Sequence, residues 1–199
     1  MEVRPVKQDQ ISLATKRKLA AALKSAMKKK AFDRITVKEL LEECDISRPT
    51  FYYHFEDIYS LMKWMFETEA VELLKKSDNC LTWDEGIFLL LSYIKENREV
   101  CLCAYNSVGR DLLRRFFSQS VRSVLRTFMD TLLEDMTASP KAEQVEFIAD
   151  FYTSAFAASI LNWLQDGAKR EPEEMLHLWD ISAHGSIAAA LERSAQEAK

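Results

Sequence analysis

The chain has 199 residues, of which 48% are hydrophobic and 29% charged, the balance of a globular protein rather than a disordered one. Its 4 Gly and 4 Pro residues are too few for the hairpins of a β-sandwich or the glycine-rich loops of nucleotide-binding folds. Strong helix formers such as Ala, Leu, Lys and Glu dominate instead, so composition predicts an all-α protein.

Charge is divided unevenly along the chain, although the net charge is only −4. Residues 1–54 carry 12 basic and 7 acidic side chains, a net charge of +5, whereas the other 145 residues carry 15 and 24, a net charge of −9. A basic N-terminal segment on an acidic body is typical of a protein whose N-terminal part meets nucleic acid.

Cysteine content and hydropathy indicate the cellular compartment in which the protein is expected to work. The first residues, MEVRPVKQDQ, are followed by no apolar leader segment, and 4 Cys are too few for a disulfide framework. The most apolar stretch, residues 147–164, falls short of a membrane span. We therefore expect a cytoplasmic protein with no membrane partner.

The first expected helix covers residues 13–31, because Leu19, Leu23 and Met27 form an apolar stripe within a lysine-rich surface. A short second helix follows Thr36, which forms a predicted capping box with Glu39.

A third helix is expected over residues 48–54, with Ser47 as N-cap and Pro49 in its first turn, where a missing N–H costs little. Two helices joined by so short a turn, inside a basic three-helix unit, indicate a helix-turn-helix.

The remainder is predicted to be helical as well. Apolar periodicity and cap residues place these helices at residues 58–76, 83–96, 98–106, 109–136, 140–166 and 172–195.

Residues 32–61, FDRITVKELLEECDISRPTFYYHFEDIYSL, resemble the DNA-binding domain of the TetR family of bacterial transcriptional regulators. The resemblance rests on Thr36, the short turn, Ser47 and the aromatic run of residues 50–55, and it covers about 60 residues. The segment SRPTFYYHFEDIYSLMKW also resembles a sub-branch that includes the activator of dihydroxyacetone-kinase operons and a zinc-responsive regulator. Asp45 stands where the family usually has Gly, a position that Asp tolerates.

The resemblance implies two domains: a helix-turn-helix DNA-binding domain over residues 1–56 and an all-helical ligand-binding and dimerisation domain over residues 57–199. It also implies a homodimer on double-stranded operator DNA. Small residues on the helices at 140–166 and 172–195 are candidates for the dimer face, or for core packing within one chain. Two-fold symmetry is favoured because a single seven-residue helix reads few bases.

Several side chains suit DNA contact. Arg can read guanine edges, a Thr methyl can meet the thymine methyl, and Tyr or His can hydrogen-bond phosphate. The alternative is an ordinary surface helix whose aromatic side chains pack inward, as we expect for Phe51 and Phe55. The DNA-contact candidates are Lys28, Thr36, Ser47, Arg48, Thr50, Tyr52, Tyr53 and His54.

The C-terminal part is rich in aromatic side chains, which either form a packed core or line the effector cavity that the resemblance implies. The candidate lining residues are Phe88, Tyr105, Phe116, Phe128, Phe156 and Trp163.

Metal binding and catalysis find little support. Cys101 and Cys103 are two residues apart and would point to different faces of a helix, which leaves structural roles for them and for His177 and His184. We expect no catalytic residues, metal site or cofactor, because none of the common motifs occurs.

The sequence thus predicts a DNA-binding transcription regulator that responds to a small-molecule effector or a protein partner. Repression is the commoner mode, and activation is the alternative sign. The rival function is a helical adaptor that binds DNA and a protein partner without an effector of its own.

Overall fold

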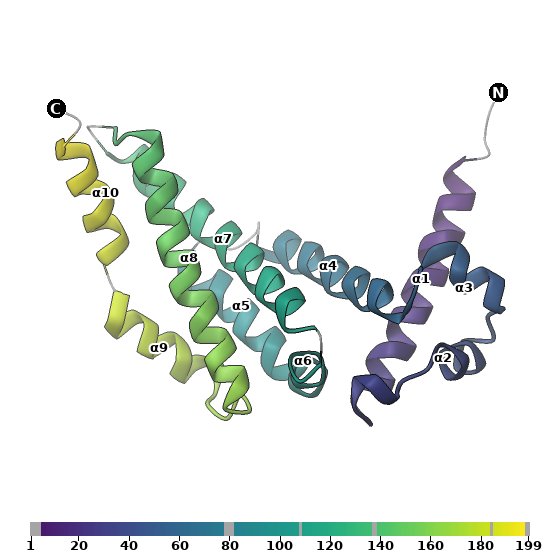
Figure 1. The fold of residues 1–199 in the computed structure, drawn as a ribbon. Helices are drawn as coiled ribbons and strands as arrows, with labels where there is room; N and C mark the ends of the chain where they lie inside the picture. The colour runs from purple at the N-terminus through teal and green to yellow at the C-terminus, as the bar shows by residue number, and fades with distance from the viewer. Residues whose placement is uncertain (1–4, 78–81, 108, 137–138, 184, 198–199) are drawn as a thin grey trace. The chain divides into compact units, whose positions relative to one another are not determined.

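The computed structural model describes residues 5–77, 82–107, 109–136, 139–183 and 185–197. Every regular element in these ranges is helical, which confirms the predicted all-α class (Figure 1). Within the same ranges, none of the helices combines the length and apolar character that a membrane crossing requires. The elements are α1 (Pro5–Met27), a 3-10 turn (Phe32–Arg34), α2 (Val37–Cys44), α3 (Arg48–His54), α4 (Ile58–Ser77), α5 (Trp83–Glu96), α6 (Arg98–Tyr105), α7 (Arg110–Glu134), α8 (Ala142–Gln165), α9 (Pro172–Ala183) and α10 (Ser186–Glu197).

Two of the predicted helices differ from those in the structure. The first helix was expected over 13–31, but α1 begins at Pro5, a residue suited to a first helical turn, and ends at Met27. The amides of Lys29 and Lys30 both donate to the carbonyl of Ala26, at 2.9 and 3.1 Å, and this turn closes the helix. The last predicted helix, 172–195, is two helices, because Gly185 has a φ of +68° and interrupts the helical path.

The chain forms two compact units, which we describe separately. The N-terminal unit contains residues 1–69 and 99–113, and the C-terminal unit contains residues 70–98 and 114–199. This division by packing does not follow the predicted boundary at residue 56, because the first turns of α4 and residues 99–105 of α6 belong to the N-terminal unit. The functional boundary at residue 56 remains a prediction.

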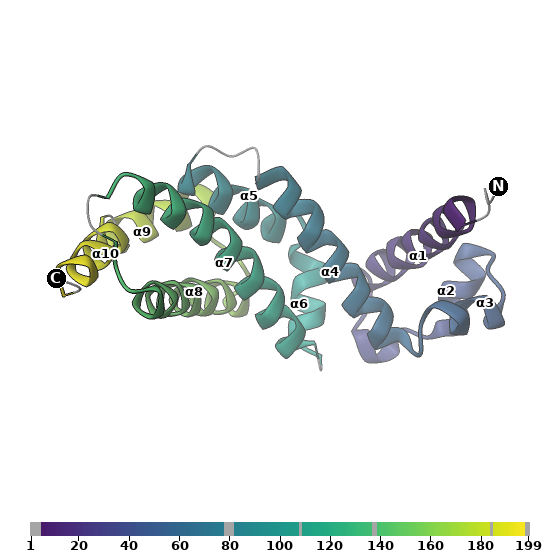
Figure 2. The same cartoon turned by 90° about the horizontal axis from the view of Figure 1, so that it is seen from above.

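The core of the N-terminal unit contains the predicted stripe of α1. Leu19 and Leu23 are fully buried and Met27 is 2% exposed, which confirms that stripe. The α2 helix packs on α1, and α3 lies beside α2 in both Figure 1 and Figure 2. A half-buried ion pair of 2.7 Å, from Lys24 Nζ to Glu69 Oε1, joins α1 to α4.

The C-terminal unit is held by two further helix pairs, α5 with α9 and α8 with α10, and the second pair lies side by side in both views (Figures 1 and 2). Gly86 allows α5 to approach α7 closely, since a Cβ atom there would lie 2.6 Å from Val124 Cγ1. The predicted capping box of α5 forms completely: the Glu85 amide donates to Thr82 Oγ1 and the Thr82 amide to Glu85 Oε2.

Asp45 ends α2 in the left-handed region, with φ 50° and ψ 50°, as expected for a position that usually carries Gly. Its carboxylate also lies at the negative end of the helix dipole. We therefore expect Asp45→Gly to raise the free energy of unfolding by about 1 kcal/mol, measured by chemical denaturation. Asp45→Asn, which removes only the charge, is the control, and a less stable Asp45→Gly protein would contradict the prediction.

Candidate nucleic-acid interface and ligand pocket

The α3 helix begins at a well-formed cap. Ser47 has extended backbone angles, and its Oγ accepts a hydrogen bond of 3.3 Å from the Thr50 amide. The Ser47 and Thr50 hydroxyl oxygens are also 2.7 Å apart, and Pro49 occupies the first turn. The predicted start of this helix is therefore confirmed, and the two hydroxyl groups are already paired with each other.

Two aromatic anchors divide the helix into an inner and an outer face. Phe51 is fully buried and Phe55 is 5% exposed, with ring centroids 5.9 Å apart, as expected. Arg48 is exposed at the first position of the helix, and Tyr52 and Tyr53 are 51% and 78% exposed. The outer face thus presents one guanidinium and two phenol groups, which are hydrogen-bonding groups suited to base edges and phosphates.

His54 is half-buried at the end of α3, with its ring 4.9 Å from that of Tyr53. Burial, and then the positive charge of Lys16, lower the pKa of its imidazole below the usual value. The ring is therefore neutral at pH 7, and we expect it to meet DNA as a hydrogen-bonding group rather than as a charge.

The lysines of the first predicted helix differ in their surroundings: some contact other side chains of the N-terminal unit, and others are exposed. Lys24 pairs with Glu69, and the Lys16 ammonium lies over the rings of Phe55 and Trp64, at 5.8 and 5.9 Å. Lys28 is exposed but lies just beyond the end of α1 rather than within it, contrary to the predicted helix range. Whether a lysine lies within α1 therefore does not decide whether its ammonium group is accessible to a DNA phosphate.

Thr36 begins α2, and its Oγ1 accepts a 3.4 Å hydrogen bond from the Glu39 amide. The half of the predicted capping box in which Thr36 accepts is thus present, and the Glu39 carboxylate accepts a hydrogen bond of 2.6 Å from Lys30 and one of 3.4 Å from the Thr36 hydroxyl. The hydrogen bond from Lys30 is the main reason why the pKa of Glu39 lies below its usual value. Thr36 is exposed, so its side chain is accessible to a phosphate.

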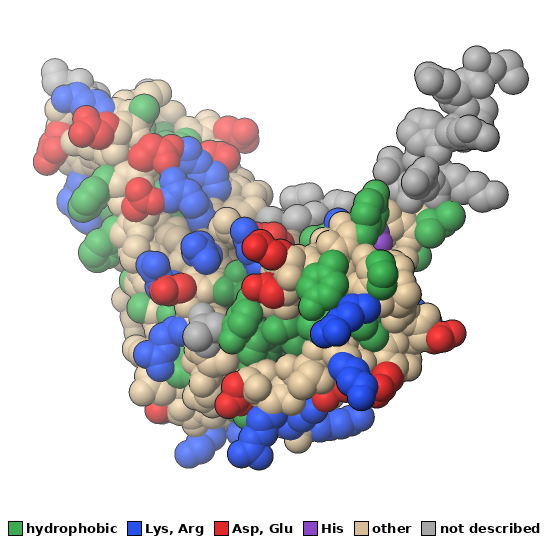
Figure 3. All heavy atoms as spheres, turned by 45° about the vertical axis from the view of Figure 1, so that its right-hand side comes forward, with side chains coloured by type: hydrophobic (Ala, Val, Ile, Leu, Met, Phe, Trp, Pro, Cys, Tyr) green, Lys and Arg blue, Asp and Glu red, His purple; other side chains and the backbone are tan. Residues whose placement is uncertain are grey.

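Basic side chains do not form one continuous block on the visible surface. Figure 3 shows lysine and arginine side chains interspersed with carboxylates, and apolar side chains between them. On this face the cations are therefore placed individually rather than as one basic patch.

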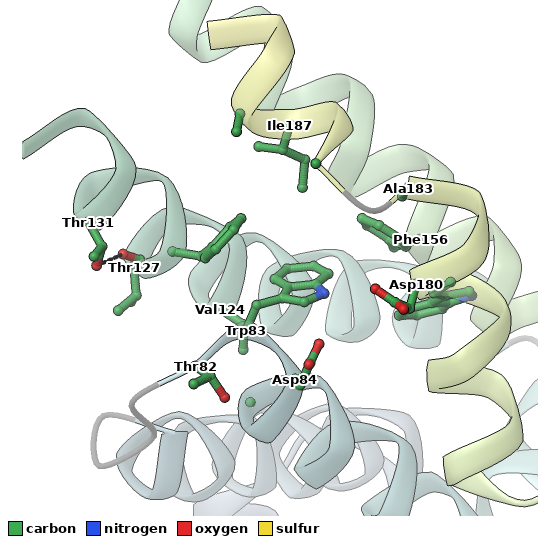
Figure 4. Close-up of a pocket in the computed structure, with 15 residues that line it drawn as sticks. Thr82, Trp83, Asp84, Val124, Thr127, Thr131, Phe156, Asp180, Ala183 and Ile187 are labelled. Atoms are coloured by element: carbon green, nitrogen blue, oxygen red, sulfur yellow. Dashed lines mark hydrogen bonds between the residues drawn. The ribbon is translucent and has the colours of Figure 1, made fainter. Parts of the chain in front are cut away.

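The C-terminal unit contains a pocket of about 450 Å³ between α5, α7, α8, α9 and α10 (Figure 4). This volume is within the range of pockets for small organic ligands. The lining residues are Thr82, Trp83, Asp84, Gly86, Val124, Thr127, Phe128, Thr131, Phe156, Trp179, Asp180, Ala183, Gly185, Ile187 and Ala188.

The pocket brings together two of the six predicted lining residues, Phe128 and Phe156. The other four do not line it. Phe116 is 3% exposed against Tyr93, and Trp163 is 5% exposed.

The remaining two candidates also lie elsewhere. Tyr105 belongs to the N-terminal unit, where the Arg110 guanidinium lies 4.4 Å from its ring centroid. Phe88 is half-buried in α5.

Sequence reasoning missed the polar part of this pocket. Asp84 and Asp180 lie about 100 residues apart in the chain, and each resembles an ordinary surface carboxylate in its own helix. Trp83 and Asp84 lie in the first turn of α5, where an acidic side chain is common, so their position gave no local signal of a pocket.

Metal-ligating residues do not cluster in the described part of the chain, where no group of three or more His, Cys, Asp or Glu side chains could hold an ion. Burial raises the pKa of the Cys101 thiol to about 12, and the Cys103 thiol donates to the Lys30 carbonyl at 3.5 Å. His184 and Cys80 lie outside the described residues.

Comparison with known families supports both parts of the chain. A family model described as "Bacterial regulatory proteins, tetR family" matches residues 19–63, which include α2 and α3. A second, described as "Transcriptional regulator C-terminal region", matches residues 81–185, just over half of the chain.

Individual relatives agree. The HTH-type dhaKLM operon transcriptional activator DhaS of Lactococcus lactis subsp. lactis (strain IL1403) is 32% identical over 87 residues, 44% of this chain and 46% of the relative, so the match spans about half of that protein. The solved structure of "Dihydroxyacetone kinase operon activator DhaS" has a TM-score of 0.72 at 20% identity, covering 92% of this chain and 99% of that one.

A TetR transcriptional regulator from Streptococcus agalactiae 2603V has a TM-score of 0.58 at 22% identity, over 86% of this chain and 94% of that one. These structural similarities show a common fold, and the matches together confirm the predicted family and the predicted resemblance to the dihydroxyacetone-kinase activator branch. The chain therefore belongs to the TetR family and is a transcriptional regulator.

Proposed function

We propose that this protein binds a near-palindromic operator as a cytoplasmic homodimer and changes transcription when its C-terminal part binds an effector. The observation that carries the DNA-binding part is the geometry of α3. Phe51 is fully buried and fixes the helix, while Arg48, Tyr52 and Tyr53 remain exposed on its outer face.

Each candidate has a distinct role on DNA. Arg48, at the start of α3, enters the major groove and pairs its guanidinium with guanine O6 and N7. Tyr53, near the end of the helix, and the exposed Thr36 at the start of α2 contact phosphates. Ser47, Thr50, Tyr52 and His54 complete the base-facing and backbone-facing surface, and Lys28 adds charge.

The homodimer is supported by an exposed apolar row on α8. Phe147 and Phe151 are 71% and 59% exposed, and Ala155 and Ala158 continue the same face at helical spacing. Not all small residues of α8 can belong to this interface, because Ala149 and Ala157 are 1% and 3% exposed and pack within the chain. An apolar row of this kind is normally covered by a partner.

We expect Ala158→Glu to dissociate the dimer, because a dimer interface buries on the order of 1,600 Å² and does not accommodate an unpaired charge. Light scattering would then show a particle of 23.0 kDa, the mass of one chain. Ala142→Glu is the matched control: Ala142 is exposed on the same helix, but helical spacing places it on the side opposite Phe151. A dimeric Ala158→Glu protein, or a monomeric wild type, would refute the α8 interface.

The pocket of about 450 Å³ favours an effector-responsive regulator over an adaptor without an effector of its own. Binding there changes DNA affinity if the two states of the dimer bind the effector differently, a coupling that is typically about 1–3 kcal/mol. Repression remains our prediction for the sign as the commoner mode, although the similar proteins named above are described as activators.

The full chain, incubated with a random-sequence DNA pool and sequenced after several rounds of selection, tests the function. We expect enrichment of a two-fold symmetric site, with binding that weakens steeply as salt rises. Enrichment of an asymmetric site would refute the dimeric mode, and no enrichment at all would refute sequence-specific DNA binding.

A further inference from the structure

We propose that the pocket of the C-terminal unit binds a compact organic cation, a positively charged nitrogen carried on an aromatic or bulky apolar body. The proposal specifies the chemistry of the effector in the proposed function. Its evidence is the composition of the pocket wall, which combines an aromatic surface with carboxylates (Figure 4).

The aromatic surface is continuous. The ring of Trp83 lies between those of Phe128 and Phe156, with centroid distances of 6.0 and 5.1 Å, and Phe156 lies 4.6 Å from Trp179. Trp179 is held in place by a 2.9 Å hydrogen bond from its Nε1 to Ser159 Oγ. Aromatic faces carry partial negative charge and attract cations, with Trp the strongest of the three ring types.

Two carboxylates complete this surface, Asp84 from α5 and Asp180 from α9. Both side chains are exposed, and Figure 4 shows their carboxylate groups turned toward the indole of Trp83. Lys, Arg and His are absent from the described residues that line the pocket. The exposed carboxylate of Asp84 therefore places a negative charge on the polar side of the wall, beside aromatic faces that also attract cations.

The hydroxyl groups on α7 strengthen the preference for a donor-bearing or cationic ligand. Thr127 donates its hydroxyl proton to the Ser123 carbonyl at 3.3 Å, and Thr131 donates to the Thr127 carbonyl at 3.1 Å. Each hydroxyl oxygen can then only accept a hydrogen bond from a ligand.

The opposite chemistry, an anion at the positive end of α5, is disfavoured by the residues already there. The Glu85 carboxylate accepts a hydrogen bond from the Thr82 amide, and the Thr82 hydroxyl accepts one from the Glu85 amide. Asp84 adds a second negative charge to the same turn. An incoming anion would meet two carboxylates at that helix end.

Three probes of similar shape and different charge test the proposal: phenyltrimethylammonium, its neutral isostere tert-butylbenzene, and benzenesulfonate. Binding is followed by NMR of the indole N–H groups in the full chain, without DNA. We expect the cation to shift the Trp83 signal saturably and to bind about tenfold more tightly than the neutral isostere. The signal of Trp64, in the N-terminal unit, serves as the internal reference.

Asp84→Asn and Asp180→Asn are expected to reduce the preference for the cation, and the double variant to bring it within about twofold of the neutral isostere. Asp130→Asn is the matched control, because it removes an exposed carboxylate from α7 next to Thr131 without changing the pocket wall. Trp83→Leu is expected to weaken cation binding while leaving the carboxylates in place.

Equal affinity for the cation and its neutral isostere, tighter binding of the sulfonate, or no saturable binding of the cation would overturn the proposal. So would a preference for the cation that survives in the double variant. Because this assay contains no DNA, its failure is separate from failure of the proposed function, which the DNA selection measures. Cation binding without enrichment of a DNA site would support the pocket chemistry and refute the operator binding.

Discussion

Phe51→Ala is expected to destabilise the N-terminal unit by about 3–5 kcal/mol, the usual effect of removing a buried aromatic side chain. Phe51 is fully buried, and its ring contacts those of Tyr52 and Phe55 at centroid distances of 5.4 and 5.9 Å. The α3 helix has only seven residues, too few to be stable without tertiary packing. Loss of Phe51 leaves Phe55 as the remaining aromatic anchor and is therefore expected to loosen the packing of α3.

The free energy of unfolding is measured by chemical denaturation and followed by the NMR signal of the Trp64 indole N–H, because Trp64 lies in the same unit with its ring 5.9 Å from that of Phe55. Tyr53→Ala is the control on the same helix, since that side chain is 78% exposed and its loss is expected to change stability by about 0.5 kcal/mol or less. A loss of less than about 1 kcal/mol for Phe51→Ala would show that α3 is held by other contacts.

Arg48→Ala is expected to weaken binding to the selected operator by about 1–3 kcal/mol per half-site and to relax the preference at one base pair. Arg48 is exposed at the first position of α3, where a long side chain reaches the groove without changing the helix itself. Arg48→Ala is expected to weaken binding to scrambled DNA much less, because scrambled DNA does not offer a guanine at the position that the guanidinium reads.

Two companion variants separate this base-reading role from phosphate contacts. Tyr53→Phe removes one hydroxyl and is expected to weaken binding to all sequences about equally. Loss of Lys28 is expected to reduce the slope of the salt dependence by about one. All three are compared by fluorescence anisotropy on the operator and on scrambled DNA across a salt series. If Arg48→Ala weakened both DNAs by the same factor, or neither, Arg48 would not be the base reader.

The fold could largely be predicted because helical order is local. The stripe of Leu19, Leu23 and Met27, the cap at Ser47 and the capping box at Thr82 each determine structure within a few residues, and the structure has all three. The errors lie where local rules compete. Gly185 adopts a positive φ and divides a periodic segment into α9 and α10, although the apolar pattern continues across it.

The exposed face of α3, the candidate DNA-binding surface, could be predicted from the sequence for the same reason. All residues of α3 come from one short segment, so its helical period already separates buried Phe51 from exposed Arg48 and Tyr53. The sequence could not show which lysines are available to DNA, because that depends on tertiary contacts. Lys24 pairs with Glu69 of α4, and Lys16 lies over the rings of Trp64 in α4 and Phe55 at the end of α3.

The sequence by itself therefore determined the helical class, the helix-turn-helix and its exposed face, since these depend on spacing within single helices and on cap residues next to them. Only the tertiary structure decided the pocket. Its wall joins Trp83 and Asp84 of α5, Phe128 of α7, Phe156 of α8 and Asp180 of α9, which are up to about 100 residues apart. An aromatic side chain in a packed core and one in a pocket wall have the same sequence signature, because burial depends on which helices come together.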